Sequence, residues 1–226
     1  KTLTRSAAFA SLAGFLLAID GLAIVLSRVA LLDGILTLFV LLAFWFTALD
    51  VRRQDERMAA LVAHRLEGEE APAWGPVFWN RPWLLAAGLA AGAACGVKWS
   101  GLYVLAALGI FVVVADALAR RRAGFWQWPA DAVIRQGPVS FLLLVPVAAV
   151  GYLASWTGWL VTDGGYGRHS ADASPATGFW AWVPLPLQDL WLHHISIYNF
   201  HVGLSTPHNY QSPAWQWPLL IRPTSM

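Results

Sequence analysis

Charged side chains are scarce in this chain. Of its 226 residues only 12% are Asp, Glu, Lys or Arg, whereas a soluble domain carries roughly 25%. Apolar residues make up 58% of the chain and are gathered into long runs. This combination excludes an ordinary soluble domain and indicates an integral membrane protein. The formal net charge of +2 is too small to suggest a nucleic-acid partner.

Cysteine is almost absent, and several common catalytic motifs are missing. Cys95 is the one cysteine, so no internal disulfide can form. Its apolar surroundings in the sequence favour a small core residue over a reactive thiol. The chain has no Gly-rich phosphate loop, no G-x-S-x-G motif and no repeat of about 20–50 residues. It starts at Lys1 without a signal-peptide pattern and stops at Met226, so we expect the interior of a longer protein.

Five apolar runs divide the chain, and in lipid such runs form helices because the backbone has no water to bond with. We therefore predict an all-α, polytopic membrane helix bundle over residues 1–160. Charged loops join the runs at 50–81, with a short surface helix at 50–66, and at 119–136. A polar, aromatic-rich region covers 161–226. The predicted membrane helices are residues 6–26, 35–49, 82–97, 102–118 and 137–159.

The distribution of Lys and Arg predicts the orientation of the bundle. Most of these residues lie near the N-terminus and in the loops 50–81 and 119–136. We expect that side to be cytoplasmic and the opposite side, with region 161–226, to be extracytoplasmic. The outer side holds only four cations, which run against the bias: Arg28, Lys98, Arg168 and Arg222.

Arg28 and Asp33 lie five residues apart at an outer turn between two apolar runs. An arginine there can bind a phosphate in a bidentate manner. The alternative is an ion pair between the two that stabilises the turn, and spacing alone favours it. Asp20 lies within the first run, where an acid usually faces the bundle interior or a cavity. Pairing with a neighbouring helix is as good an account of Asp20 as a direct role.

Lys98 stands at the turn between two apolar runs, followed by Trp99 and, one turn on, Tyr103. An unpaired ammonium far from water costs about 3 kcal/mol in a membrane. Lys98 therefore either snorkels to the interface beside an aromatic belt or has an anion. The anion we consider is the phosphate of a lipid-linked sugar, with Trp99 and Tyr103 packing on the sugar or the lipid chain. The residues alone leave the two alternatives even.

Histidines gather in the last third of the chain. Zinc ligands must converge and are held by further hydrogen bonds, and the sequence has neither a His-Glu-x-x-His motif nor a cysteine partner there. Metal binding is therefore not favoured, and residues 189–204 instead predict an amphipathic interfacial helix. His194 and His201 share a face of that helix that can point at a site.

The segment from His208 and Tyr210 to Pro223 is too rich in Pro for a long helix. It predicts a rigid outer loop, whose aromatic residues either stack on sugars or anchor the loop at the membrane interface.

Three of these stretches together resemble one family. They are Ser27-Arg28-x-x-Leu31-Leu32-Asp33, Gly96-x-Lys98-Trp99-Ser100-Gly101-Leu102-Tyr103, and His208-x-Tyr210-x-Ser212-x-x-Trp215-x-Trp217-Pro218-Leu219-x-x-Arg222-Pro223. They resemble the polyprenyl- or dolichyl-phosphate-mannose–protein mannosyltransferases, with the actinobacterial branch as the close match. The resemblance covers essentially the whole chain. Its second and third stretches are specific, and its first is moderately so.

The resemblance implies a partial GT-C fold, with five of about eleven membrane helices in this chain. It implies inverting transfer of mannose from a polyprenyl phosphate to Ser or Thr hydroxyls of secreted proteins, at the outer face of the plasma membrane. The family's acidic pair, where the catalytic base lies, falls upstream of residue 1, so no catalytic residue is assigned in this chain. The donor or acceptor would contact Arg28, Asp33, Lys98, Trp99, Tyr103, His194, His201, His208 and Tyr210.

The implied partners are the polyprenyl-phosphate-mannose donor, an unfolded or translocating secreted acceptor, membrane lipid and the secretion machinery. We expect no cofactor, no metal and no nucleic acid. The alternatives are a GT-C enzyme that uses another lipid-linked sugar, a transporter of a polyprenyl lipid, or a non-catalytic partner subunit. A transporter is expected to have paired, broken helices in two related halves, and the sequence shows no internal symmetry.

Overall fold

The computed structural model describes residues 4–28, 32–64, 70, 72–205, 213 and 215–216. These residues contain helices and turns and no strand. The all-α prediction is therefore confirmed for the described residues. The chain divides into two compact units, residues 1–157 and 158–226, which are described separately below.

The first unit begins with two short helices, α1 (Ala7–Ala18) and α2 (Gly21–Arg28). The sequence predicts one helix over 6–26, which is wrong because the apolar run is broken at Ile19 and Asp20. The side-chain oxygen Oδ2 of Asp20 accepts a hydrogen bond of 2.7 Å from the backbone N–H of Ala23. Asp20 therefore caps the start of α2, as a short acidic side chain does at a helix N-terminus, and it is exposed instead of facing the bundle interior.

Helix α3 (Asp33–Ala63) is twice the length that the sequence predicts for it. Its second half covers residues 50–63 of the predicted loop 50–81, nearly the whole of the short surface helix predicted at 50–66, and continues the membrane helix without a break because residues 50–63 have no Gly or Pro. One face of this half packs against the bundle. Its residues Thr47, Asp50, Gln54 and Met58 recur every three or four positions and are all buried, and three of the four are polar. On the opposite face, Arg52 and Glu56 form an exposed ion pair of 2.9 Å one helical turn apart.

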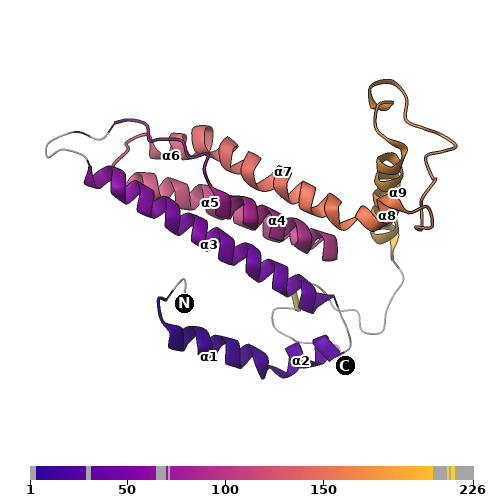
Figure 1. Cartoon of the computed structure of the whole chain (residues 1–226), viewed down its shortest axis with the longest axis horizontal. Helices are drawn as coiled ribbons and strands as arrows, with labels where there is room; N and C mark the ends of the chain where they lie inside the picture. Colours follow the sequence, from indigo (N-terminus) through magenta and orange to yellow (C-terminus); the bar gives the residue numbers. More distant parts are fainter. Residues whose placement is uncertain are drawn as a thin grey trace. The chain divides into compact units, whose positions relative to one another are not determined.

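Four helices form the body of the unit: α3, α4 (Pro82–Val97), α5 (Gly101–Arg122) and α7 (Gly137–Ser155), where α4 packs against the other three (Figure 1). Helix α4 has the same bounds as the predicted run. Between α5 and α7 lie α6 (Trp128–Ala130) and a π-helical turn, η1 (Asp131–Gln136). These elements replace much of the predicted loop 119–136.

Glycine lets α4 and α7 approach closely. Gly88, Gly92 and Gly96 repeat every four residues along one face of α4. A Cβ atom on Gly92 would collide with the backbone of Ala148, and one on Gly88 would lie 2.7 Å from the carbonyl oxygen of Leu144. Such spacing is typical of helix pairs that pack in a membrane, where van der Waals contact replaces the hydrophobic effect.

Within the part of the chain that the structure describes, three helical segments are long and apolar enough to cross a membrane: Asp33–Ala63, Gly101–Arg122 and Trp128–Ser155. Two shorter apolar helices, Ala7–Ala18 and Pro82–Val97, accompany them. Most large side chains on these helices are exposed, including Leu41, Ile110 and Phe141. An apolar exterior of this kind requires lipid or other apolar protein around it, so the chain is a multi-pass membrane protein.

The second unit contains α8 (Thr157–Val161), which begins at the boundary, a 3-10 turn η2 (Gly178–Trp180) and α9 (Leu185–Gly203). Helix α9 starts four residues earlier than the predicted helix 189–204, because Pro186 fits the first turn of a helix. Asp189 and Leu190 are its buried residues. The fold of this unit is a long loop held against α9.

Candidate functional site

Lys98 lies at the end of α4, where the chain turns sharply into α5. The backbone of Lys98 is extended, and its N–H donates to the carbonyl oxygen of Ala94. Only three residues separate the two helices. A Cβ atom on Gly101 would lie 2.6 Å from the backbone nitrogen of Cys95, so the first residue of α5 must be glycine for a turn this tight.

The ammonium of Lys98 is paired with a residue that the sequence assigns to another partner. Its Nζ atom lies 3.1 Å from Oδ1 of Asp33 at the start of α3, and both side chains are about half exposed, at 54% and 41%. Asp33 therefore pairs with Lys98 instead of with Arg28, which was the alternative favoured by spacing. An exposed pair of this kind contributes at most about 1 kcal/mol to stability. Because the pair is weak and exposed, a ligand can compete for the ammonium of Lys98.

Arg28 is the last residue of α2 and is exposed. The ion pairs between residues that the structure describes do not include it. Asp33 follows it five positions later, and this length of chain spans at most about 18 Å. Arg28 and Lys98 therefore lie toward the same end of the first unit, where α2 contacts α3.

The two aromatic candidates near Lys98 differ in their contacts. The indole Nε1 of Trp99 lies 3.4 Å from the hydroxyl oxygen of Tyr152 on α7, which is within reach of a long hydrogen bond. Tyr103 is 81% exposed. The structure thus leaves the ring of Tyr103 open beside the lysine turn.

The histidine candidates belong to the second unit. The ring nitrogen Nδ1 of His194 lies 2.6 Å from the carbonyl oxygen of Leu190, one turn back along α9, and His201 is exposed. His208 and Tyr210 lie outside the described residues. Within the described residues no group of three His, Cys, Asp or Glu side chains could hold a metal ion.

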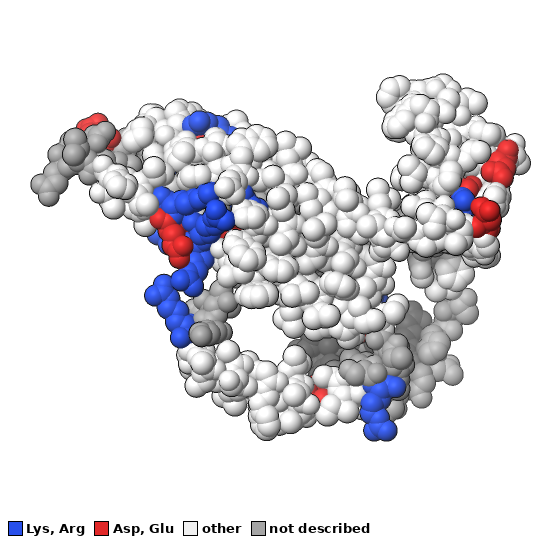
Figure 2. All heavy atoms as spheres, in the orientation of Figure 1, with Lys and Arg blue, Asp and Glu red and all other residues white. Residues whose placement is uncertain are grey.

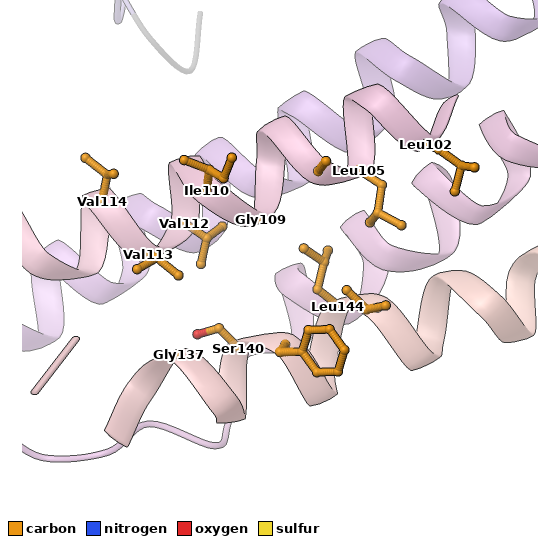
Figure 3. Close-up of a pocket in the computed structure, with 13 residues that line it drawn as sticks. Leu102, Leu105, Gly109, Ile110, Val112, Val113, Val114, Gly137, Ser140 and Leu144 are labelled. Carbon is orange, nitrogen blue, oxygen red and sulfur yellow. The ribbon is translucent and has the colours of Figure 1, made fainter. Parts of the chain in front are cut away.

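An apolar cavity of about 520 Å³ lies between α5 and α7 (Figure 3). It runs from Leu102, four residues after Lys98, past Gly109 to Val114, a length of about 18 Å along the helix. Leu144 of α7 faces it from the other side (Figure 3), and Phe141 of the same helix also lines it. The only polar side chain in its lining is Ser140. The cavity suits a hydrocarbon chain and offers little to a polar ligand.

A buried ionic network, which the sequence analysis missed, lies at the far end of the same bundle. Arg81, just before α4, is 1% exposed. Its guanidinium donates to Asp50 on α3 at 2.5 Å, to Asp116 on α5 at 2.6 Å and to Ser140 on α7 at 2.8 Å. Burial opposes its charged form, but the charges of Asp116 and Asp50 raise the pKa of Arg81 above its ordinary value. One guanidinium therefore joins three helices and the start of a fourth.

A second guanidinium extends this network. Arg120 is fully buried and lies 2.8 Å from Asp131 in the π-helical turn. Asp131 also accepts from the backbone N–H of Gly75 at 2.8 Å, and Gln136 accepts from the backbone N–H of Phe78 at the same distance. Charged groups gather at this end of the bundle, while the visible apolar flank is uncharged (Figure 2). Asp116 within an otherwise apolar run is the sequence signal that points to this network.

The second unit is organised around its own buried pair. Arg168 donates to Asp189 at 2.6 Å, and Asp189 also accepts from the backbone N–H groups of His169 and Ala171. Arg168 further lies over the ring of Trp159 at 5.1 Å. The loop that precedes η2 is thereby fixed to the first turns of α9.

A ring stack adds to this unit. His193 stacks on Trp159, with ring centroids 5.8 Å apart. Burial, and secondly the neighbouring His194, lower the pKa of His193 below its ordinary value. Neutral His193 is therefore the form that this packing favours.

Fold and site together define a class: a multi-pass helical membrane protein with cations at one end of its bundle and an apolar cavity that runs from that end between α5 and α7. Comparison with known proteins narrows the class. Residues 1–68 match the sequence model of the family described as dolichyl-phosphate-mannose-protein mannosyltransferase. No solved structure matches the chain.

Curated relatives extend the match to the rest of the chain. The chain is 36% identical over 99% of its length to a polyprenol-phosphate-mannose–protein mannosyltransferase of Mycobacterium tuberculosis. It is 33% identical to the protein of that name from Mycolicibacterium smegmatis and 30% identical to that from Corynebacterium glutamicum, each over 99% of this chain. The chain belongs to this family of protein mannosyltransferases. It spans 43% to 44% of the length of these relatives.

Proposed function

We propose that the chain is part of an enzyme that transfers mannose from a polyprenyl-phosphate-mannose donor to Ser or Thr hydroxyls of secreted proteins. Its similarity to polyprenol-phosphate-mannose–protein mannosyltransferases supports this reaction. The observation that carries it at the level of the site is the cation pair at one end of the bundle. Lys98 pairs with Asp33, and Arg28 lies toward the same end of the bundle, so two positive charges against one carboxylate leave a net charge of +1 for an anion.

The chemistry explains why fixed positive charge is needed. The acceptor oxygen forms a bond to the anomeric carbon of mannose, and the bond from that carbon to the phosphate oxygen breaks. The hydroxyl proton passes to a base, which the resemblance puts outside this chain. The donor is a phosphodiester with a single negative charge, and the departing polyprenyl phosphate carries up to about two. Cations beside the leaving oxygen stabilise the charge as it develops.

The donor's hydrocarbon needs an apolar path, and the cavity between α5 and α7 provides one. It begins one helical turn beyond Lys98 and is lined almost entirely by apolar side chains. We therefore assign the phosphate to the Lys98 end and the first isoprene units to this cavity. Tyr103, exposed between the two, would pack against the sugar or the lipid chain.

The distribution of Lys and Arg supports an orientation with the Lys98 end outward, in the plasma membrane. The structure modifies the count behind it, because Arg81 and Arg120 are buried and paired. Arg52, Arg53, Arg57, Arg121, Arg122 and Arg135 still lie at or near the opposite end. The excess of arginines on the cytoplasmic side therefore remains when Arg81 and Arg120 are left out of the count.

The proposal is tested by Arg28→Met in the full-length parent protein, in membranes, with labelled polyprenyl-phosphate-mannose and a Ser/Thr acceptor peptide. Loss of one charge-assisted hydrogen bond to phosphate, at about 1.5–3 kcal/mol, lowers kcat/KM by about 10- to 150-fold. Arg52→Met at the opposite end is the matched control and should leave transfer unchanged. Normal transfer by Arg28→Met would contradict the phosphate role.

Three alternatives give different outcomes in the same preparation. A transporter moves polyprenyl lipid across vesicles without sugar transfer. A partner subunit leaves transfer dependent on a second protein and lacks an acidic pair in the sequence preceding Lys1. Transfer of a sugar other than mannose would indicate a related transferase with another lipid-linked donor.

A further inference from the structure

A second apolar cavity, of about 670 Å³, lies within the second unit. It is formed by the segment around η2 and the first turns of α9. Its main lining residues are Ala176, Trp180, Val183, Leu187, Trp191 and Leu192. Neither the sequence motifs nor the mannosyl-transfer chemistry uses this cavity.

The lining offers almost no free polar group to an occupant. Its one amide side chain, Gln188, is used within the unit: Oε1 accepts from the backbone N–H of Ala176 at 2.7 Å, and Nε2 donates to the carbonyl oxygen of Val183 at 2.6 Å. Ser174 is the other polar residue of the lining. An extended peptide requires partners for its backbone groups, and a cavity that lacks them suits a hydrocarbon chain.

The apolar surface continues beyond the cavity onto α9. Trp191, Ile195, Tyr198 and Val202 recur every three or four residues along this helix, and all four are exposed. Phe179 in η2 and Trp182 just after it are exposed at 78% and 71%. Exposed Trp and Tyr around an apolar surface are typical of proteins that lie at a membrane interface.

Charge is confined to another part of the unit. The described residues from Gly158 onward include only four charged side chains, Asp163, Arg168, Asp172 and Asp189, and none of them lines the cavity. Arg168 connects the other three: it contacts Asp189 and Asp163 directly, and Asp189 accepts a hydrogen bond from the backbone of the loop that carries Asp172. Figure 2 shows these charged atoms together on one side of the unit, with the rest of its visible surface uncharged.

The second unit also begins close to the end of a membrane-spanning segment. The apolar segment Trp128–Ser155 is long enough to cross a membrane, and the second unit begins at Gly158. Ser155 and Gly158 are three positions apart, a length of chain that spans about 11 Å at most. The start of the unit is therefore held within reach of the lipid headgroups.

We propose that the cavity takes up lipid acyl chains and docks the second unit on the bilayer, with the loop at Gly164 facing water. The occupant is the membrane itself, because the lining is hydrocarbon, the rim is rich in Trp and the charges are segregated. The consequence is a fixed orientation of α9, whose stripe from Trp191 to Val202 lies in the interface. This inference does not depend on the proposed mannosyl transfer.

Spin labels on the full-length parent in nanodiscs test the docking. In a Cys95→Ala background, with any other cysteines of the parent replaced, single labels are placed at Trp180→Cys and Leu187→Cys. Gly164→Cys is the matched control in the same unit, because a Cβ atom there meets nothing within 4 Å. Collision with oxygen, which concentrates in lipid, is compared with collision with a water-soluble nickel chelate.

Docking predicts that oxygen collision exceeds nickel collision at positions 180 and 187 and that the order inverts at 164. Nickel collision that exceeds oxygen collision at 180 and 187 would place the cavity in water and overturn the proposal. Low collision with both reagents and an immobilised label would show that a protein segment covers the cavity, which also overturns it. A parent that fails to transfer mannose but shows the inversion still supports the docking.

Discussion

Arg81 connects three helices through one buried guanidinium, so its removal should be the most damaging single change in the first unit. Arg81→Met keeps most of the side-chain volume but leaves Asp50 and Asp116 buried without their cation. The lost contacts are two hydrogen bonds to Asp50, one of 2.6 Å to Asp116 and one of 2.8 Å to Ser140. Removing one partner of a buried ion pair costs about 3–5 kcal/mol, because the remaining charge is uncompensated.

Arg52→Met is the control for this prediction. It also removes an arginine from an ion pair, with Glu56, but both side chains are more than half exposed, at 51% and 64%. Such a pair contributes about 0–1 kcal/mol. Thermal unfolding of the two variants in the same detergent should show a much larger loss of Tm for Arg81→Met.

A second substitution separates the ionic account from general damage to packing. Asp116→Asn in the Arg81→Met background removes one of the two unpaired charges and should restore part of the lost Tm. If Arg81→Met unfolds within about 1 kcal/mol of Arg52→Met, or if Asp116→Asn lowers the Tm further, the ionic account of this end of the bundle is wrong.

Two further predictions concern packing and pH. Gly92→Leu forces α4 and α7 apart and should cost about 1–3 kcal/mol or more, measured as a loss of Tm, whereas Gly14→Leu, where a Cβ meets nothing within 4 Å, should cost little. Since the pKa of His193 is lowered by burial, the folded second unit binds fewer protons than the unfolded chain, so its stability should fall as the pH drops below about 6.5 through the lowered pKa. Protease protection of the second unit should follow this decline in the parent and lose it in His193→Gln. A parent that is equally protected at about pH 7.5 and about pH 5.5 would contradict this assignment.

The sequence predicts the helical membrane class well because long apolar runs with few charges have only one stable structure in lipid. The helix at Pro82–Val97 is predicted with its observed bounds, since Pro starts it and Lys98 ends it. The starts of α5 and α7 are also predicted to within one residue. The end of α3 is not predicted, because its polar half is stabilised by burial of Asp50 and Gln54 against the bundle. No local signal distinguishes that buried stripe from a solvated helix.

The sequence identifies candidate residues of the site, but it does not predict which of them form ion pairs with each other. Lys98 and Asp33 are each singled out by the sequence, but their 3.1 Å contact joins residues 65 positions apart. Spacing favours the near neighbour Arg28 for Asp33, and tertiary packing overrides it. For the histidines of α9, the sequence shows their helical spacing. What their side chains face depends on how the second unit docks on the membrane, which the spacing does not determine.

The role of the cations is tested most directly by the binding of polyprenyl phosphate, without sugar, to the full-length parent and to two variants that break the same ion pair. If Lys98 holds phosphate, Lys98→Met weakens binding by about tenfold or more, the value of one charge-assisted hydrogen bond. Asp33→Asn frees the ammonium and removes a competing negative charge, so it should bind as tightly as the parent or more tightly. Equal loss in both variants would show that the pair merely stabilises the turn, and unchanged binding in Lys98→Met would contradict the phosphate site altogether.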